Sequence, residues 1–201
     1  MHEELTQVQQ QILACQRCAL AGYPVQGPPI FSGAAHARLM LIGQAPGKVE
    51  AAQTHKPFSG NAGKRLFRWL AQAGWGESYF RQQFYMTSVT KCFPGPNKSG
   101  RGDRAPSRKE QQLCAEWLQA ELMLVEPEVI VPVGKMAIER FFGRNRKLVD
   151  IIGGRYQIEG WLVVPLPHPS GASSWIQKRE HQLLITRAIT YLSILREELG
   201  L

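Results

Sequence analysis

The stretch that decides the fold is residues 39–47, which reads LMLIGQAPG. Its first four residues are apolar without interruption, which is typical of a strand buried on both faces of a parallel sheet. The glycines and the proline that follow predict a tight turn at the carboxyl end of this strand. Because such a strand must be covered by helices on both sides, we expect an α/β protein.

Strand-like and helix-like segments alternate along the rest of the chain. Further apolar runs predict strands at residues 85–91, 129–133 and 162–166. Apolar residues at helical spacing predict helices at residues 3–14, 62–73, 107–125 and 175–199. Ser107, with Glu110 three residues on, is the predicted N-cap of the third helix. The predicted fold class is therefore a three-layer α/β/α sandwich around a short, mostly parallel four-stranded sheet. The chain has 201 residues, and we expect residues 1–201 to form a single domain.

The charge balance favours a polyanionic partner. Lys and Arg number 24 against 16 Asp and Glu, which gives a net charge of +8. DNA or RNA suits such a chain better than an acidic protein does. No apolar run reaches the roughly 18 residues of a membrane span, and the acidic start lacks the apolar segment of a secretory signal. We expect a cytoplasmic protein, associated with the nucleoid if the source is bacterial.

Three loops are candidates for a ligand site, because ligands of such folds bind beyond the carboxyl ends of the strands. These loops are residues 43–63, 92–106 and 167–174. Their glycines and prolines let the backbone approach a ligand closely. Phe58 offers a flat face for stacking, and His168 offers a donor whose charge is easily tuned.

Four cysteines are the second unusual feature of the sequence. Cys15 and Cys18 form a C-x2-C pair, whereas Cys92 and Cys114 stand alone downstream. In a reducing compartment such a set suggests a metal site before it suggests disulfides. Zinc and a four-iron cluster both accept four thiolates, and Cys92 and Cys114 are equally compatible with ordinary buried thiols. Spacing alone does not choose among these alternatives.

Several short motifs occur in an order that resembles one known family. The chain carries GQAPG at residues 43–47, PFSGNAG at 57–63, VTKC at 89–92 and HPS at 168–170. Together with the cysteines they resemble the uracil-DNA glycosylase superfamily, most closely its family 4, the iron-sulfur type, although Gln44 replaces the usual glutamate. The resemblance implies the three-layer fold. It also implies a 4Fe-4S cluster, with structural zinc as the alternative, held by Cys15, Cys18, Cys92 and Cys114.

The resemblance further implies roles for residues in the predicted ligand loops. A glycosylase flips its target nucleotide out of the stack and breaks the N-glycosidic bond, so donors aimed at a carbonyl oxygen of the departing base lower the barrier. His168 would be that donor, directed at uracil O2. The backbone of Gln44 and Ala45 would line the base pocket, and Phe58 would stack on the base.

The group that activates the attacking water departs from the family pattern. Gln44 and Asn61 are the catalytic candidates by position, and both are neutral amides that orient water but cannot act as a general base near neutral pH. Ala45, where the best-known branch has an acid, cannot polarise water at all. Slow turnover is the expected consequence. Ser88 replaces an asparagine that reads the uracil edge, which leaves room for other deaminated bases.

Two segments are predicted to contact DNA outside the base pocket. The loop between Cys92 and Cys114 is rich in cations and suits contacts with phosphates, which raise affinity without reading sequence. The segment after His168 would face the minor groove, where an apolar side chain would fill the gap left by the flipped base. The predicted DNA-binding residues are Lys98, Arg101, Arg104, Ser170, Gly171 and Trp175.

Two functions are consistent with these features. The leading hypothesis is a monofunctional DNA glycosylase that excises uracil or a related deaminated base and leaves an abasic site for downstream repair enzymes. The alternative is a catalytically weak protein of the same fold that binds damaged or single-stranded DNA, motivated by Gln44, Ala45 and Ser88. A nucleotide-binding or redox protein is a third class, but the chain lacks the glycine-rich phosphate loops typical of it. The protein is expected to act as a monomer.

Overall fold

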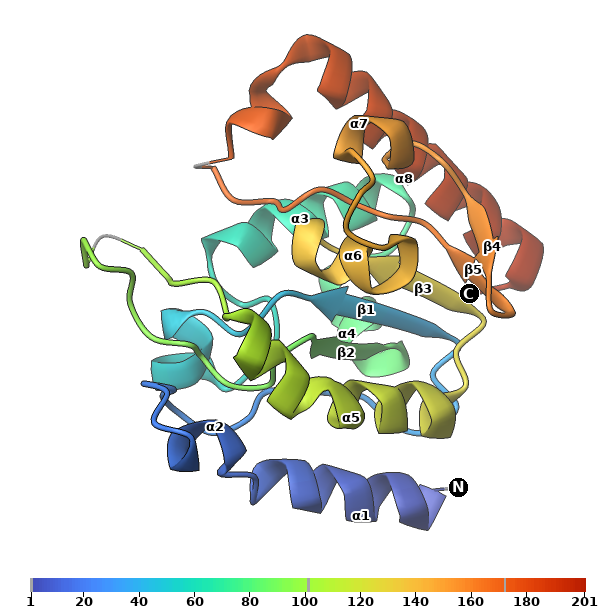
Figure 1. The fold of residues 1–201 in the computed structure, drawn as a ribbon. Coiled ribbons are helices and arrows are strands. Elements are labelled where there is room, and N and C mark those ends of the chain that lie inside the picture. The colour runs from blue at the N-terminus through green and yellow to red at the C-terminus, as the bar shows by residue number, and fades with distance from the viewer. Residues whose placement is uncertain (1, 101, 172) are drawn as a thin grey trace.

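A parallel sheet forms the middle layer of the fold (Figure 1). The computed structural model describes residues 2–100, 102–171 and 173–201, and within these residues the sheet has five strands. The strands are β1 (Leu39–Gly43), β2 (Tyr85–Ser88), β3 (Val129–Pro132), β4 (Tyr156–Ile158) and β5 (Trp161–Val163). They lie in the order β2-β1-β3-β5-β4, with β4 antiparallel to β5 and the other pairs parallel.

Helices cover both faces of this sheet and complete the three predicted layers (Figure 1). One face carries α3, α4 and α8, and the other carries α5 and α6, with α1 packed along the outside of α5. The helices are α1 (His2–Leu13), α2 (Arg17–Leu20), α3 (Asn61–Gln72), α4 (Glu77–Gln83), α5 (Arg108–Val125), α6 (Lys135–Phe142), α7 (Leu148–Ile151) and α8 (Arg179–Leu199), with helical turns η1 (Glu50–Thr54) and η2 (Ser174–Gln177).

Strand β1 is buried on both faces, as its uninterrupted apolar run predicts. Leu39 and Leu41 belong to the core under α3 and α8, whereas Met40 and Ile42 belong to the core under α5. All four side chains are inaccessible to solvent. This strand therefore lies at the centre of the molecule, between the two cores.

The structure corrects the predicted sheet, which has five strands in the described residues where four were predicted. The missed strand, β4, forms a hairpin with β5. Glu159 and Gly160 join the two strands with φ angles of 50° and 93°, as a two-residue type I′ turn requires. Because β4 lies at the sheet edge and is only half-buried, it carries no continuous apolar run. The predicted strand ends also shift, since β2 stops at Ser88 and β5 begins at Trp161.

The start of α5 confirms the predicted N-cap. The Ser107 hydroxyl accepts a hydrogen bond from the Glu110 N–H, and the Glu110 carboxylate accepts one from the Ser107 N–H. This reciprocal pair satisfies two backbone donors that the first turn of a helix otherwise leaves open. Among the described residues, no helix combines the length and the apolar character needed to cross a membrane.

Candidate active site

The carboxyl ends of β1, β2 and β3 open into a cavity of about 620 Å³. Most of the residues that the sequence analysis placed in the base pocket line it, so the chain folds them into one site although they are far apart in sequence. The position agrees with the rule that ligands of parallel sheets bind beyond the carboxyl ends of the strands. The predicted residues in its wall are Gln44, Ala45, Phe58, Asn61, Ser88, Arg104, His168 and Ser170.

His168 lies half-buried in the wall of this cavity, and a backbone N–H group orients its ring. The Ser170 N–H donates a hydrogen bond to Nδ1 of His168 over 3.2 Å. Burial lowers the pKa of His168, so the imidazole is neutral at neutral pH. A neutral imidazole that accepts at Nδ1 carries its proton on Nε2. His168 is therefore prepared to act as a hydrogen-bond donor through Nε2.

Gly134 lets the start of α6 approach this histidine closely. A Cβ atom added to Gly134 would lie 3.2 Å from Cβ and Cδ2 of His168, and the φ of Gly134 is +86°. Both the space and the backbone conformation favour glycine here. The start of α6 thus helps to fix the position of the imidazole.

Phe58 packs against Gly43, the last residue of β1, and is held in a strained backbone conformation. Its φ is 53°, and its ring packs on Gly43, where an added Cβ would lie 2.8 Å from the ring. The Arg81 guanidinium donates to the carbonyl oxygens of Pro57 and Phe58 over 2.8 and 3.1 Å. A left-handed phenylalanine is an outlier that persists only when its surroundings hold it. The arrangement presents a fixed aromatic ring to the cavity.

The polar residues beside the ring are partly committed to the protein. The Ser88 hydroxyl donates to the carbonyl oxygen of Thr90 over 2.7 Å, and Ser88 is buried. With its proton used in this way, Ser88 offers a ligand only an acceptor. Gln44 is half-buried, and its backbone carbonyl oxygen accepts from the Thr90 N–H. Asn61 begins α3 and is exposed.

Two carboxylates lie in the same cavity, around the glycine turn after β1. A Cβ atom added to Gly47 would lie 2.8 Å from an oxygen of Glu50 and 2.8 Å from an oxygen of Asp103. Glu50 is buried and accepts from the N–H groups of Ser59 and Gly60 over 3.1 and 3.0 Å, so it holds the loop that carries Phe58. Asp103 is exposed, and its carboxylate accepts a hydrogen bond from the backbone N–H of Lys48 in the same loop.

The carboxyl group of Asp103 is less acidic than that of an ordinary aspartate. Burial raises its pKa, and the negative charge of Glu50 raises it further. The backbone N–H and the charge of Lys48 act in the opposite direction and are weaker than burial. Asp103 was not predicted as a site residue, because the loop between Cys92 and Cys114 has the composition of a solvated, cationic surface loop.

The cation-rich loop is anchored by Arg104, which was predicted to bind phosphate. Its guanidinium pairs with Glu110 over 2.7 and 2.8 Å and donates to the carbonyl oxygen of Pro94 over 2.6 Å. This contact lowers the pKa of Glu110 to about 2. The structure thus gives Arg104 a position inside the loop, adjacent to Asp103. Lys98 is exposed, and Arg101 lies outside the described residues.

The four cysteines line a second cavity, of about 280 Å³, between α2, the end of β2 and α5. Burial raises the pKa of the Cys18 thiol to about 11 and that of the Cys92 thiol to about 12, and the neighbouring cysteines add to both shifts. Two N–H groups donate to sulfur. The indole N–H of Trp117 donates to Cys15 over 3.3 Å, and the backbone N–H of Lys91 donates to Cys114 over 3.4 Å. The walls therefore gather four thiols and supply donors to them.

The four cysteines line one cavity. Four cysteine sulfurs are the donor set of an iron-sulfur cluster and also of structural zinc. Within the described residues, no three Cys, His, Asp or Glu side chains converge closely enough to hold a metal ion. Four thiolates around such a space are the ligands of a 4Fe-4S cluster, and N–H groups directed at sulfur are usual around such clusters.

Comparison with known proteins assigns the chain to a family. The model of the uracil DNA glycosylase superfamily matches residues 30–190. The chain belongs to this superfamily. A type-4 uracil-DNA glycosylase of Archaeoglobus fulgidus is 30% identical over 186 residues, which cover 89% of this chain and 87% of the relative. The type-4 enzyme of Thermotoga maritima is 34% identical, covering 66% and 65%, and a type-5 enzyme of Thermus thermophilus is 33% identical, covering 60% and 57%.

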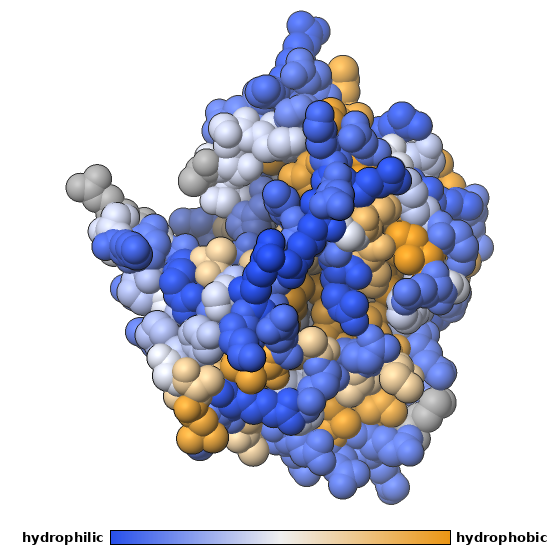
Figure 2. All heavy atoms as spheres, in the orientation of Figure 1, coloured by the Kyte–Doolittle hydropathy of each residue, from blue (hydrophilic) through white to orange (hydrophobic). Residues whose placement is uncertain are grey.

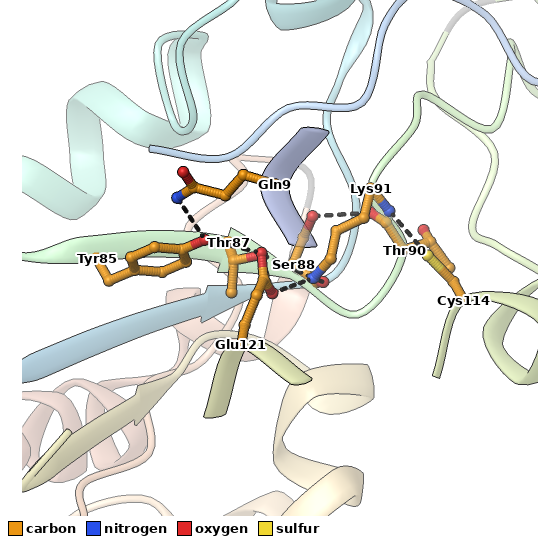
Figure 3. Close-up of polar contacts among 8 residues, drawn as sticks. All are labelled: Gln9, Tyr85, Thr87, Ser88, Thr90, Lys91, Cys114 and Glu121. Atoms are coloured by element: carbon orange, nitrogen blue, oxygen red, sulfur yellow. Dashed lines mark hydrogen bonds and ion pairs between the residues drawn. The ribbon is translucent and has the colours of Figure 1, made fainter. Parts of the chain in front are cut away.

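In this member of the uracil DNA glycosylase superfamily, a buried ion pair lies between the two cavities (Figure 3). Lys91 Nζ donates to Glu121 over 2.6 Å, to the Thr87 hydroxyl over 2.7 Å and to the carbonyl oxygen of Ser88 over 2.7 Å. The side chains of Lys91 and Glu121 are 2% and 0% exposed. All three ammonium protons have an acceptor, as a buried Lys requires. The pair thus ties α5 to the strand that would read the base.

The segment after His168 packs against the start of α8. Trp175 stacks on the ring of His181 at a centroid distance of 4.1 Å, and its carbonyl oxygen is 2.8 Å from Nδ1 of His181. Ile176 is buried. Trp175 is half-buried and belongs to the packing under α8, whereas Gly171 is exposed. Insertion of Trp175 into DNA would therefore require it to leave His181.

Proposed function

We propose that this protein is a uracil-DNA glycosylase that hydrolyses the N-glycosidic bond of uracil or a related deaminated base. The observation that carries this proposal is the neutral imidazole of His168, held at Nδ1 by the Ser170 N–H, in the wall of a cavity that Phe58 also lines. The names of the type-4 and type-5 relatives support the same reaction.

The reaction divides into a base-binding part and a bond-breaking part. The target nucleotide leaves the stack and its base lies against Phe58, which costs a few kcal/mol of unstacking and recovers part of it by stacking. As the bond from C1′ to N1 stretches, its electron pair moves onto the base. His168 donates through Nε2 to the carbonyl oxygen where this charge collects, and so lowers the barrier.

Water activation is the step that Gln44 and Asn61 leave open, since neither amide takes up a proton near neutral pH. We infer that the Asp103 carboxylate performs it. Water attacks C1′, its proton passes to Asp103, and the base departs as an anion that later takes a proton from solvent. Gln44, which lines the same cavity as Asp103, orients the water. The position of Asp103 beside Gly47, in the same cavity as His168, supports this role.

Replacing Asp103 by asparagine tests this role. We expect the single-turnover rate to fall by about 100-fold, the usual effect of losing a general base. The base must be ionised, so the wild-type rate falls as the pH drops below the raised pKa of Asp103. Asp103→Asn removes this acid limb of the pH profile, and Asp103→Glu restores it. An unchanged acid limb in Asp103→Asn would assign it to another group.

The choice of base depends on Ser88. Because its hydroxyl donates to Thr90, it accepts one hydrogen bond from the base and cannot read an amide edge at two points. We propose a relaxed preference among deaminated bases. Labelled duplexes carrying uracil, hypoxanthine or xanthine, incubated with protein and then treated with alkali, measure this. Cleavage of uracil alone would show that another group supplies the discrimination.

We propose that Cys15, Cys18, Cys92 and Cys114 hold a 4Fe-4S cluster, with structural zinc as the alternative. The cluster would cross-link the N-terminal segment to the end of β2 and to α5. We expect purified protein to absorb at about 400 nm and to contain about four irons per chain, and Cys92→Ser to lose both. One zinc per chain, without iron or sulfide, would establish the alternative.

A second function remains in competition because of specific residues. Gln44, Ala45 and Ser88 carry no catalytic charge, which favours a protein that binds damaged or single-stranded DNA with little turnover. The alkali assay on uracil paired with G, paired with A, or unpaired separates the two. Strand cleavage supports the glycosylase, and binding without cleavage supports the sensor. In either case the proposed partner is DNA and the protein acts as a monomer, and after base excision enzymes that process abasic sites would follow it.

A further inference from the structure

The start of α5, helix α6 and the loop after α6 carry exposed cations that no role described above uses. These residues line two surface hollows that share Arg144, one between α5 and α6 and one between α6, α7 and η2. Figure 2 shows strongly hydrophilic residues crossing this face as a band, over α6. We call this set the cationic band, and its residues are Arg108, Lys135, Arg140, Arg144, Arg146 and Lys147.

Little negative charge within the fold compensates the cationic band. Within the described part of the chain, Glu139 is the one carboxylate within 4.0 Å of these cations, 3.7 Å from Lys135 and 4.0 Å from Arg144. Arg140 donates to the neutral Gln119 over 3.0 Å. Such a surface attracts a polyanion over distances of about 10 Å at ordinary ionic strength.

The cationic band begins beside the candidate active site. Lys135 directly follows Gly134, which packs against His168. Trp175, from the segment that follows His168, lies with Arg144, Arg146 and Lys147 in the wall of one hollow, of about 480 Å³. The band therefore begins next to Gly134 and reaches a hollow that Trp175, from the segment after His168, also lines.

We propose that the cationic band binds the backbone phosphates of DNA on one side of the target nucleotide. This inference rests on the proposed function, since DNA held at the cavity must cross the neighbouring surface. A DNA backbone presents regularly spaced charges that long, exposed Arg and Lys side chains follow without reading sequence. An acidic protein would suit the charge, but continuity with the His168 loop favours DNA.

The test is the salt dependence of binding to an undamaged duplex. Each phosphate contact contributes about 0.9 to the slope of log K against log salt concentration. We expect Arg144→Gln/Arg146→Gln to reduce the magnitude of the slope by about 1.8 and to weaken binding at low salt. A matched double variant, Arg68→Gln/Arg155→Gln, removes two exposed cations elsewhere and is expected to leave the slope unchanged.

The outcomes separate this inference from the proposed function. An unchanged slope in Arg144→Gln/Arg146→Gln, or an equal loss in the matched control, would overturn the band as a DNA-binding surface. Because undamaged DNA is used, the comparison holds even if the wild-type protein excises no base.

Discussion

Replacing His168 by alanine will slow base release under single-turnover conditions by about 100-fold or more, the cost of removing one donor from a developing oxyanion. The structure gives the reason. The Ser170 N–H occupies Nδ1, burial keeps the ring neutral, and His168 lines the cavity, so we expect the remaining proton on Nε2 to serve the base. Labelled DNA with one uracil, saturated with protein and sampled over time before alkali treatment, measures the rate.

A glutamine at this position is the matched control. Its side-chain amide donates a hydrogen bond but lacks the ring contact with Gly134, so we expect His168→Gln to lie between wild type and His168→Ala. Because burial lowers the pKa of His168, the neutral donor persists as the pH rises, and its contribution stays constant above neutral pH. Full activity of His168→Ala would show that another group stabilises the departing base.

Replacing Lys91 by methionine will destabilise the protein by about 3–5 kcal/mol, because it leaves the Glu121 carboxylate buried without its cation. Glu121 is 0% exposed and Lys91 is 2% exposed, so water cannot replace the lost charge. The side chains are otherwise similar in length, so the change removes mainly the charge. Urea unfolding of the variant and of wild type, each with the same metal content, measures the difference.

The double variant Lys91→Met/Glu121→Gln separates charge from packing. The glutamine still accepts hydrogen bonds from the hydroxyls of Tyr85 and Thr87, which bond Glu121 in the wild type. We expect it to recover about 2 kcal/mol or more relative to Lys91→Met, because no unpaired charge remains. A Lys91→Met variant as stable as wild type would mean that the pair adds nothing to stability.

The part of the fold that follows from local chemistry could be predicted from the sequence. The apolar run of β1 and the Ser107 cap are properties of neighbouring residues, and both are confirmed. Strand β4 was missed because its signal is a two-residue turn of positive φ at Glu159 and Gly160, which an edge strand does not reinforce with burial. The residues of the base pocket were recognisable because their motifs end the predicted strands.

The remaining site residues depend on contacts between distant segments. Lys91 ends a predicted strand and has the sequence character of a surface charge, yet it is buried and pairs with Glu121, thirty positions away on α5. Arg104 was predicted to bind phosphate because its loop is cationic, and only the fold shows it paired with Glu110. Asp103 enters the cavity because that pair anchors the loop. No spacing rule in a single sequence contains this information.

The most direct test of the central claim is to measure free base released from DNA by the purified wild-type protein. A duplex with a single uracil opposite guanine is incubated with excess protein, and free uracil and abasic strand are quantified by mass spectrometry. We predict that both products form in equal amounts and that the protein is recovered unmodified. A protein that binds this DNA, with its cysteine site loaded, and releases no uracil would contradict the account.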